Sequence, residues 1–129
     1  MTISENQVLL RDFYRARAVR DARYMDRCVT DDVRWTIAGK CTIQGKREFS
    51  KAIREMSSGD PRHVRVTHII TDNSEGAVQG TMTGTSRTGE KQTLSFCDIY
   101  KLSGSRDPKI REIISYTIAI EPAVPPAQQ

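Results

Sequence analysis

Hydrophobic positions recur with a helical period in three segments of the first half of the chain. From about Ser4 to Val19, one stripe holds Leu9, Phe13, Ala16 and Arg20, with Leu10 and Tyr14 beside it. Ser4 is expected to be the N-cap, and Gln7 would complete a capping box. A second, short helix is expected from Asp21 to Cys28, and a third from about Lys46 to Ser57 with Phe49, Ala52, Ile53 and Met56 on its apolar stripe.

Alternating patterns, typical of strands, make up most of the remaining chain. Residues 33–38 alternate as a first strand after a break at residues 30–32, and Gly39 and Gly45 bracket a loop or short hairpin. From residue 63 onward the pattern predicts strands at 63–70, 77–86, 93–102 and 109–120, separated by short turns. The tail, residues 122–129, is expected to be disordered.

This order of elements predicts the class of fold. Early helices followed by a late meander of strands are typical of an α+β domain. The sheet must curl around the helices to bury the apolar faces of both, which gives a cone-shaped, curved antiparallel sheet wrapped around N-terminal helices. With no linker or internal repeat, a single domain over residues 1–121 is expected.

The strand at residues 93–102 aims a carboxyl group at the interior. Because side chains alternate between the faces of a strand, Asp98 shares its face with Phe96 and Tyr100. A buried carboxyl group must be paired, protonated or put to use. One interpretation is a structural acid that accepts hydrogen bonds from a backbone amide, a tyrosine or an arginine; the other is a functional acid or base.

Composition narrows the class of protein. The chain is 37% hydrophobic and 28% charged, with short apolar runs, so we expect a globular protein without a membrane span. The N-terminus has no basic region followed by an apolar block, so a cytoplasmic location is expected. Three widely spaced cysteines without a Cys/His cluster predict neither a disulfide framework nor a metal site.

The arginines are concentrated early in a chain of net charge +4. They could bind phosphates, or they could form a solvated helical face with acidic residues as local partners. No nucleic-acid-binding motif is visible, so no nucleic-acid partner is expected. The residues concerned are Arg11, Arg15, Arg17, Arg20, Arg23 and Arg27, with Asp12, Asp21 and Asp26 between them.

A set of loose motifs, in this order and spacing, resembles the nuclear transport factor 2-like superfamily, and within it the SnoaL-like cyclases and ketosteroid isomerases. The motifs are FYRA at 13–16, Asp21, TDDVRW ending at Trp35, IQGKREF with Gly45, CDIYKL and KIREIISY. The resemblance runs from about Gln7 to Ile120 and implies a cone enclosing a pocket. It does not specify a reaction, because this fold hosts isomerases, cyclases, dehydratases, hydrolases and non-catalytic modules.

A comparison by position separates the relatives. The oxyanion-hole tyrosine of the ketosteroid isomerases falls on Phe13, their general base on or near Ile37, and their oxyanion-hole aspartate on Asp98. Steroid isomerisation by that mechanism is therefore not expected. The SnoaL-like cyclases keep an acid on this later strand for proton transfer, which implies that Asp98 is the acid or base.

Further candidates follow from strand and helix phase. Tyr14 could reach the cavity with its hydroxyl, and His68, in phase with Val64, Val66 and Ile70, is the better placed of the two histidines. Both have structural alternatives, as packing residues. Asp98, Tyr14 and His68 form the predicted catalytic set. The predicted substrate pocket consists of Phe13, Trp35, Ile37, Phe49, Ile53, Met82, Phe96, Tyr100, Ile113, Ser115 and Thr117.

Two functions are compatible with this pattern. The first is a cofactor-independent enzyme of the isomerase, cyclase or lyase type, which moves a proton on an apolar, carbonyl-type substrate. The alternative is a non-catalytic module that binds a ligand or a partner protein. A close contact from Asp98 to Tyr14 or His68 would favour the enzyme. An outer sheet face with Ile99, Ile114, Tyr116 and Ile118 predicts a homodimer in either case.

Overall fold

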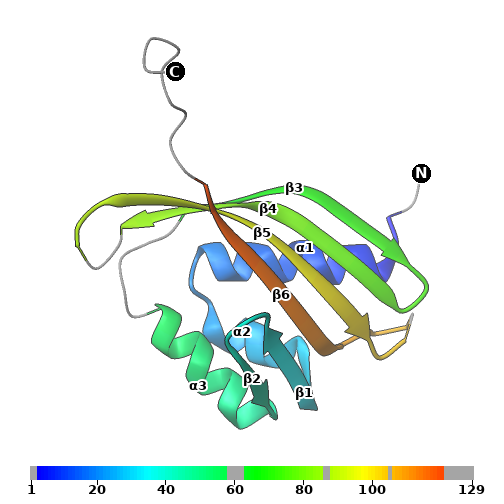
Figure 1. Cartoon of the computed structure of the whole chain (residues 1–129). Coiled ribbons are helices and arrows are strands. Elements are labelled where there is room, and N and C mark those ends of the chain that lie inside the picture. The colour runs from blue at the N-terminus through cyan, green and yellow to red at the C-terminus, as the bar shows by residue number, and fades with distance from the viewer. Residues whose placement is uncertain (1–2, 58–62, 86–87, 105, 121–129) are drawn as a thin grey trace.

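The computed structural model describes residues 3–57, 63–85, 88–104 and 106–120. Three helices and six strands follow one another along the described chain (Figure 1). They are α1 (Glu5–Ala18), α2 (Ala22–Arg27), β1 (Val29–Ile37), β2 (Cys41–Gln44), α3 (Lys46–Ser57), β3 (His63–Asp72), β4 (Glu75–Thr85), β5 (Lys91–Leu102) and β6 (Ile110–Ile120). The predicted boundary at residue 121 and the predicted disordered tail lie outside the described residues.

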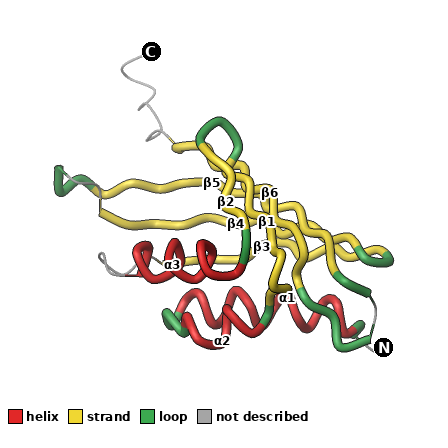
Figure 2. Tube along the Cα trace, turned by 90° about the horizontal axis from the view of Figure 1, so that it is seen from below, coloured by secondary structure: helices red, strands yellow, loops and turns green. Residues whose placement is uncertain are grey.

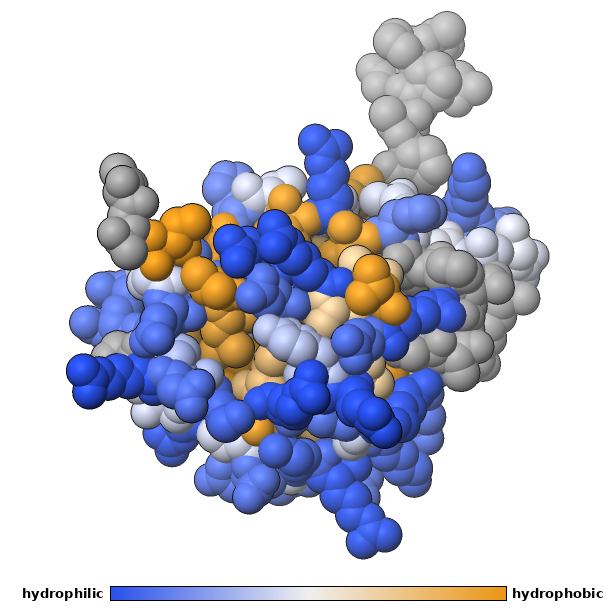
Figure 3. All heavy atoms as spheres, turned by 180° about the vertical axis from the view of Figure 1, so that it is seen from behind, coloured by the Kyte–Doolittle hydropathy of each residue, from blue (hydrophilic) through white to orange (hydrophobic). Residues whose placement is uncertain are grey.

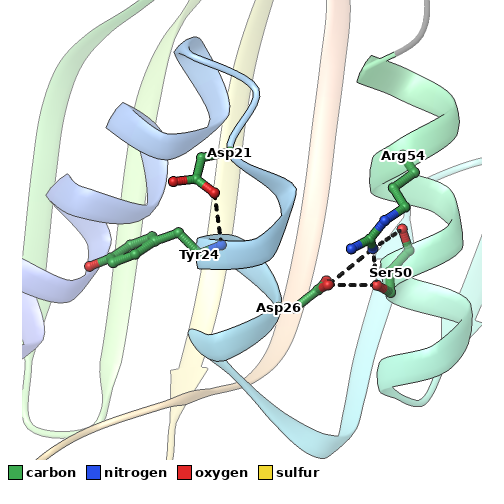
Figure 4. A network of polar contacts seen from close by, with 5 residues as sticks. All are labelled: Asp21, Tyr24, Asp26, Ser50 and Arg54. Carbon is green, nitrogen blue, oxygen red and sulfur yellow. Dashed lines mark hydrogen bonds and ion pairs between the residues drawn. The ribbon is translucent and has the colours of Figure 1, made fainter.

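Side-chain caps define where the first two helices begin. The hydroxyl of Ser4 accepts a hydrogen bond from the backbone N–H of Gln7 at 3.1 Å, as predicted. The side chain of Gln7 does not complete a capping box, because its Nε2 donates instead to the carbonyl of Ile69 on β3 at 3.3 Å. Asp21 caps α2 by accepting from the backbone N–H of Tyr24 at 3.1 Å (Figure 4).

The strands form a single sheet with the order β2-β1-β6-β5-β4-β3. One pair departs from the predicted antiparallel arrangement: β1 pairs with β6 in parallel, while the other neighbouring strands pair antiparallel. Parallel neighbours need a long crossover connection, and the chain from β2 to β5 supplies one. The first strand also starts earlier than predicted: β1 begins at Val29, not at Val33, and its pairing with β6 is irregular between Val29 and Arg34.

The helices cover one face of the curved, unclosed sheet and leave the other face bare (Figures 1 and 2). Aromatic side chains fill the space between the layers. Phe49 of α3 packs against Phe13 of α1 and Trp35 of β1, with ring centroids 6.5 and 5.8 Å away. This α+β arrangement confirms the predicted fold class and places the core between α1, α3 and the concave face of the sheet.

Polar contacts fix α3 against α2. The carboxylate of Asp26 accepts hydrogen bonds from Ser50 Oγ at 2.7 Å and from Arg54 Nη1 at 3.0 Å (Figure 4). Because Ser50 and Arg54 lie one turn apart, both reach the same oxygen from one side of α3. The inner side of the helix, with Phe49 and Ile53, is thereby held against the sheet.

In the part of the chain that the structure describes, no helix combines the length and the apolar character that crossing a membrane requires. The cytoplasmic location stays a prediction. The three cysteines are free thiols. Cys28 is buried, and burial raises the pKa of its thiol to about 11, so at neutral pH it is an inert packing residue.

Candidate functional site

Asp98 lies in the interior, on the face of β5 that the helices cover. Its side chain is only 3% exposed, between Phe96 and Tyr100 on the same face of the strand. Val78 of β4 and Ser115 of β6 are its register partners on the two neighbouring strands. The predicted strand phase is therefore confirmed, and the carboxyl group occupies a site walled by apolar and hydroxyl-bearing side chains.

Tyr14 reaches this carboxyl group from α1. Its hydroxyl donates a hydrogen bond to Asp98 Oδ2 and also contacts the hydroxyl of Tyr100. Each hydroxyl carries one proton, so if Tyr14 donates to Asp98, Tyr100 donates to Tyr14. The result is a buried chain from Tyr100 through Tyr14 to Asp98, which gives one oxygen of the carboxyl group, Oδ2, a hydrogen-bond donor.

The two tyrosines keep their protons across the physiological range. Burial, with the nearby Tyr100 and Asp98, raises the pKa of Tyr14 well above its ordinary value. Burial, followed by the charge of Asp98, raises the pKa of Tyr100 in the same way. A neutral phenol in a poorly solvated site is a hydrogen-bond donor, so the pair is suited to hold a carboxylate or another negatively charged oxygen.

A small cavity adjoins Asp98. Ten side chains line it: Phe13, Arg17, Met25, Trp35, Phe49, Ile53, Asp98, Tyr100, Ile113 and Ser115. The space open to the centre of a water molecule is about 10 Å³, enough for roughly one water. The predicted residues thus converge, but their own side chains nearly fill the interior, and no open hydrophobic pocket is present at this site.

One further hydrogen bond orders the wall. Trp35 Nε1 donates to Ser115 Oγ at 2.9 Å, and both residues are buried. The indole is thereby oriented against the cavity, and its only polar atom has a partner. Because Ser115 accepts this bond, its own hydroxyl proton remains available for another acceptor.

Other predicted pocket residues surround the cavity without lining it. Phe96 is buried and stacks on Tyr14, with ring centroids 5.8 Å apart. Met82 is buried on β4, and Ile37 is half-buried and packs against the core. Thr117 is exposed, next along the inward face after the buried Ser115. The buried core ends before Thr117, so the burial of this residue does not support its predicted place in the pocket.

The placement predicted for His68 is wrong. Between Val66 and His68 the pairing with β4 contains a β-bulge, in which Thr67 is the extra residue. The bulge inverts the phase, so that Ile69 rather than His68 packs with Val66 against the core. His68 is exposed, and its Nδ1 lies 2.9 Å from Oε1 of Gln79. It cannot reach Asp98 from the opposite face of the sheet.

Arg17 and Met25 line the cavity but are not among the predicted site residues. Of the expected stripe of α1, Phe13 and Ala16 are buried, whereas Leu9 and Arg20 are only half-buried. The neighbouring Leu10 and Tyr14 are buried in their place, so the helix is slightly rotated from the expected orientation. Spacing carries the signal for Arg17: it follows Phe13 by four positions and Tyr14 by three, which places all three on one side of a helix. Its positive charge, shared with five neighbouring arginines, instead favoured a place on the solvated face.

Two other arginines on α1, the half-buried Arg11 and the exposed Arg15, do have a local acidic partner, as expected. Asp12 Oδ1 lies 3.2 Å from Nε of Arg11 and 3.7 Å from Nη1 of Arg15. Figure 3, which shows the side opposite to Figure 1, presents many hydrophilic residues with hydrophobic surface between them. Such exposed pairs add little to stability.

Two larger hollows lie at the surface. One, of about 230 Å³, separates α1 from β3 and is lined by Arg11, Tyr14, Arg15, Ala18, Val64, Val66 and Ile69. The other, of about 830 Å³, is an open depression over α3 lined mainly by charged side chains. Neither contains Asp98. The first is the more relevant, because Tyr14 borders it and donates to Asp98 on the inner side.

Comparison with known proteins agrees with this architecture. The family model of the SnoaL-like domain matches residues 10–113. An NTF2-like protein of unknown function from Burkholderia pseudomallei has a TM-score of 0.80 at 21% identity, covering 90% of this chain and 92% of that one. No sequence among the curated proteins matches.

Two other similar structures have more specific descriptions. One is an epoxide hydrolase from M. tuberculosis, described as LEH-like, with a TM-score of 0.76 at 16% identity, covering 89% of this chain and 84% of that one. The other, from Xanthomonas campestris, is proposed to be a polyketide cyclase; its TM-score is 0.75 at 15% identity, covering 86% and 88%. At these identities the likeness shows the fold alone. The family match over most of the chain shows more: this protein belongs to the SnoaL-like domain family, with an NTF2-like fold.

Proposed function

We propose that the protein is a cofactor-independent enzyme of the isomerase, cyclase or lyase type. Its substrate is a small, mainly apolar carbonyl compound, and Asp98 is the acid–base group. The hydrogen bond from Tyr14 to Asp98 is the observation that carries the proposal. Enzymes named as an epoxide hydrolase and a proposed polyketide cyclase share the fold, which supports a catalytic role without defining the reaction.

The reaction uses the carboxylate of Asp98 as a base. It removes a proton from the carbon next to the substrate carbonyl, and the electron pair of that C–H bond moves toward the carbonyl oxygen. Asp98 then returns the proton to the same or another carbon, or to the oxygen, so that no external reactant is consumed. A base positioned in this way contributes roughly 10²–10⁴-fold to rate.

The remaining residues of the site bind and orient the substrate. Trp35, Phe13, Phe49, Ile53 and Ile113 contact its apolar part, and Tyr14 and Tyr100 hold the carboxylate in place while they stay neutral. Substrate entry requires the cavity to open. Arg17 and Met25 line it, and Met82 lies beside Arg17. Their unbranched side chains can change rotamer more easily than the rings can move.

The nearly filled interior favours a second candidate, a non-catalytic module. In that case Asp98 is a structural acid that joins β5 to α1 through Tyr14. The two candidates differ in a measurable way, because only the enzyme needs a proton-accepting oxygen on residue 98.

In either case we propose a homodimer formed through the bare face of the sheet. Tyr116 and Ile118 of β6 are 50% and 71% exposed on this face, and Ile99 and Ile114 are half-buried beside them. Contiguous apolar positions on an otherwise polar sheet face are typical of a protein interface. Pairing two copies of the same face would be an isologous contact.

The proposed function is tested by proton exchange at carbon. Proton NMR in D₂O would follow a panel of small aromatic and unsaturated ketones with the wild-type protein and with Asp98→Asn. We expect the wild type to accelerate loss of the proton next to the carbonyl for at least one compound, and Asp98→Asn to lose this acceleration. If the wild type exchanges no compound faster than buffer, or Asp98→Asn exchanges equally fast, the proposal fails.

A further inference from the structure

Arg17 is the positively charged side chain at the cavity. It lies near the end of α1, four positions after Phe13, and is half-buried. It lines the same small space as Asp98, Trp35 and Ser115. A half-buried arginine beside a cavity is partly withdrawn from water, where an anion would interact with it more strongly than at a fully exposed position.

The hydrogen-bonding capacity of Arg17 is little used. Its Nη2 lies 3.6 Å from the sulfur of Met82, and a thioether is a weak acceptor. In residues 3–57, 63–85, 88–104 and 106–120, Arg17 forms no ion pair. By contrast, Arg11 and Arg15 on the same helix both pair with Asp12. A guanidinium carries five N–H donors in a planar fork, which fits two oxygens of one group.

Two opposite charges therefore border one cavity without touching each other. Oδ2 of Asp98 accepts the hydrogen bond from Tyr14, while Nη2 of Arg17 lies against the sulfur of Met82. The charge of Arg17 acts on the buried Tyr100. It lowers the pKa of that tyrosine, although burial, the larger effect, raises it. An oxygen placed beside Arg17 would thus lie close to the proton-transfer chain without competing for Asp98.

We propose that Arg17 binds the negatively charged oxygen of the ligand, so that the site selects small planar compounds carrying a carboxylate or an enolisable carbonyl group. The catalytic part of this proposal, in which the oxygen belongs to an enolate, rests on the proposed function. When Asp98 takes the proton from carbon, the C–H bond breaks, a C=C bond forms, and the negative charge collects on the former carbonyl oxygen. Arg17 donates to that oxygen, and the charge disappears when the proton returns from Asp98 to carbon.

The binding half of this proposal is tested with benzoate and benzamide, which share a shape and differ in charge. Binding to the wild type, Arg17→Met, Arg17→Lys and Arg23→Met is measured by calorimetry or ligand-detected NMR. Arg23, on α2, is exposed and absent from the cavity lining, and its replacement removes the same charge. Thermal melting of each variant establishes that it is folded.

We expect the wild type and Arg23→Met to prefer benzoate over benzamide. Arg17→Met is expected to lose about tenfold to a hundredfold in benzoate affinity, as for a hydrogen bond to a charged group, while benzamide binding changes little. Arg17→Lys should fall between, since it keeps the charge without the planar fork. Failure of the wild type to bind benzoate, equal losses for both probes, or an equal loss in Arg23→Met would overturn the proposal.

These outcomes are separable from those of the proposed function. If Arg17→Met selectively loses benzoate binding and the wild type exchanges no ketone proton, the oxyanion site is supported and the proposed enzymatic function is rejected. Exchange that depends on Asp98 but is unchanged in Arg17→Met, with unaltered benzoate binding, would support the enzyme and reject the role of Arg17.

Discussion

The hydroxyl of Tyr14 donates a hydrogen bond to the carboxylate of Asp98 across 84 positions of sequence. This contact joins the first helix to the centre of the sheet. It also stabilises a carboxyl group in an apolar interior, because Tyr14 supplies a donor and Tyr100 supports it. The same arrangement serves a structural acid and a catalytic one, and substitutions at these residues distinguish the two.

Tyr14→Phe removes the donor and leaves the buried carboxylate short of one hydrogen bond. We expect the free energy of unfolding to fall by about 1–3 kcal/mol, the range for a buried polar group that loses its partner. Urea denaturation measures the change. Tyr116→Phe is the matched control, because Tyr116 is 50% exposed and should change stability by less than about 0.5 kcal/mol. Equal effects of the two substitutions would show that the Tyr14 hydroxyl contributes nothing.

The raised pKa values of Tyr14 and Tyr100 make stability depend on pH in the alkaline range. In the unfolded chain both tyrosines ionise near pH 10, whereas in the fold they remain neutral. Their contribution to the free energy of unfolding is therefore fully present below about pH 10. It is lost as pH rises further, because the unfolded state then releases protons that the folded state retains.

Phenolate absorbance measured beside circular dichroism checks this dependence. The folded wild type and folded Tyr14→Phe should show the same phenolate absorbance, since Tyr14 does not ionise before unfolding. A smaller absorbance in folded Tyr14→Phe would show that Tyr14 titrates in the native state.

Gly80 is required by close packing across three strands. A Cβ at this position would lie 2.2 Å from the carbonyl oxygen of Arg65 and 2.8 Å from the ring of Phe96. The backbone oxygen cannot move without disturbing the bulge of β3, so Gly80→Ala should destabilise the protein by about 1–3 kcal/mol. Gly104→Ala is the control, because a Cβ at Gly104 would meet no heavy atom within 4 Å. Thermal melts in which both variants behave alike would contradict this packing.

The proposed dimer predicts an effect of charge on the bare sheet face. Ile118→Lys should convert a dimer into a monomer in sedimentation experiments at micromolar concentration, because a lysine would be desolvated in the interface. Val19→Lys, at an equally exposed apolar position after α1, should leave the dimer intact. A wild-type protein that sediments as a monomer would reject the dimer outright.

The sequence pattern predicted the elements that depend on local chemistry. The cap at Ser4 and the inward phase of Asp98 follow from spacing alone, and both are observed. Of the stripe predicted on α3, Phe49, Ala52 and Ile53 meet the core, whereas Met56 is 51% exposed because the helix extends beyond the core there. What could not be predicted depends on pairing between distant segments. The parallel contact of β1 with β6 and the bulge at Thr67 are set by neighbouring strands, and the bulge alone reverses the face of His68.

The candidate site shows the same division. Periodicity predicted the inward positions of Phe13 and Asp98 and placed Tyr14 beside the buried stripe of α1, but it did not predict that Arg17 lines the cavity. A one-position rotation changes which of several adjacent polar residues meets the core, and packing against β3 and β4 decides it. The position of Arg17 was not predicted, because a positively charged side chain usually lies on the solvated face of a helix.

Comparing Asp98→Asn with Asp31→Asn shows whether Asp98 accepts a proton from the substrate. Asp31 has a side chain that is 98% exposed, so its replacement changes charge without touching the core. For each variant, the rate of proton exchange on the best ketone and the free energy of unfolding are measured together. We expect Asp98→Asn to fold and to exchange the proton roughly 10²–10⁴-fold more slowly than the wild type. Asp31→Asn should exchange it at the wild-type rate. A destabilised Asp98→Asn that exchanges at the wild-type rate would contradict this role of Asp98.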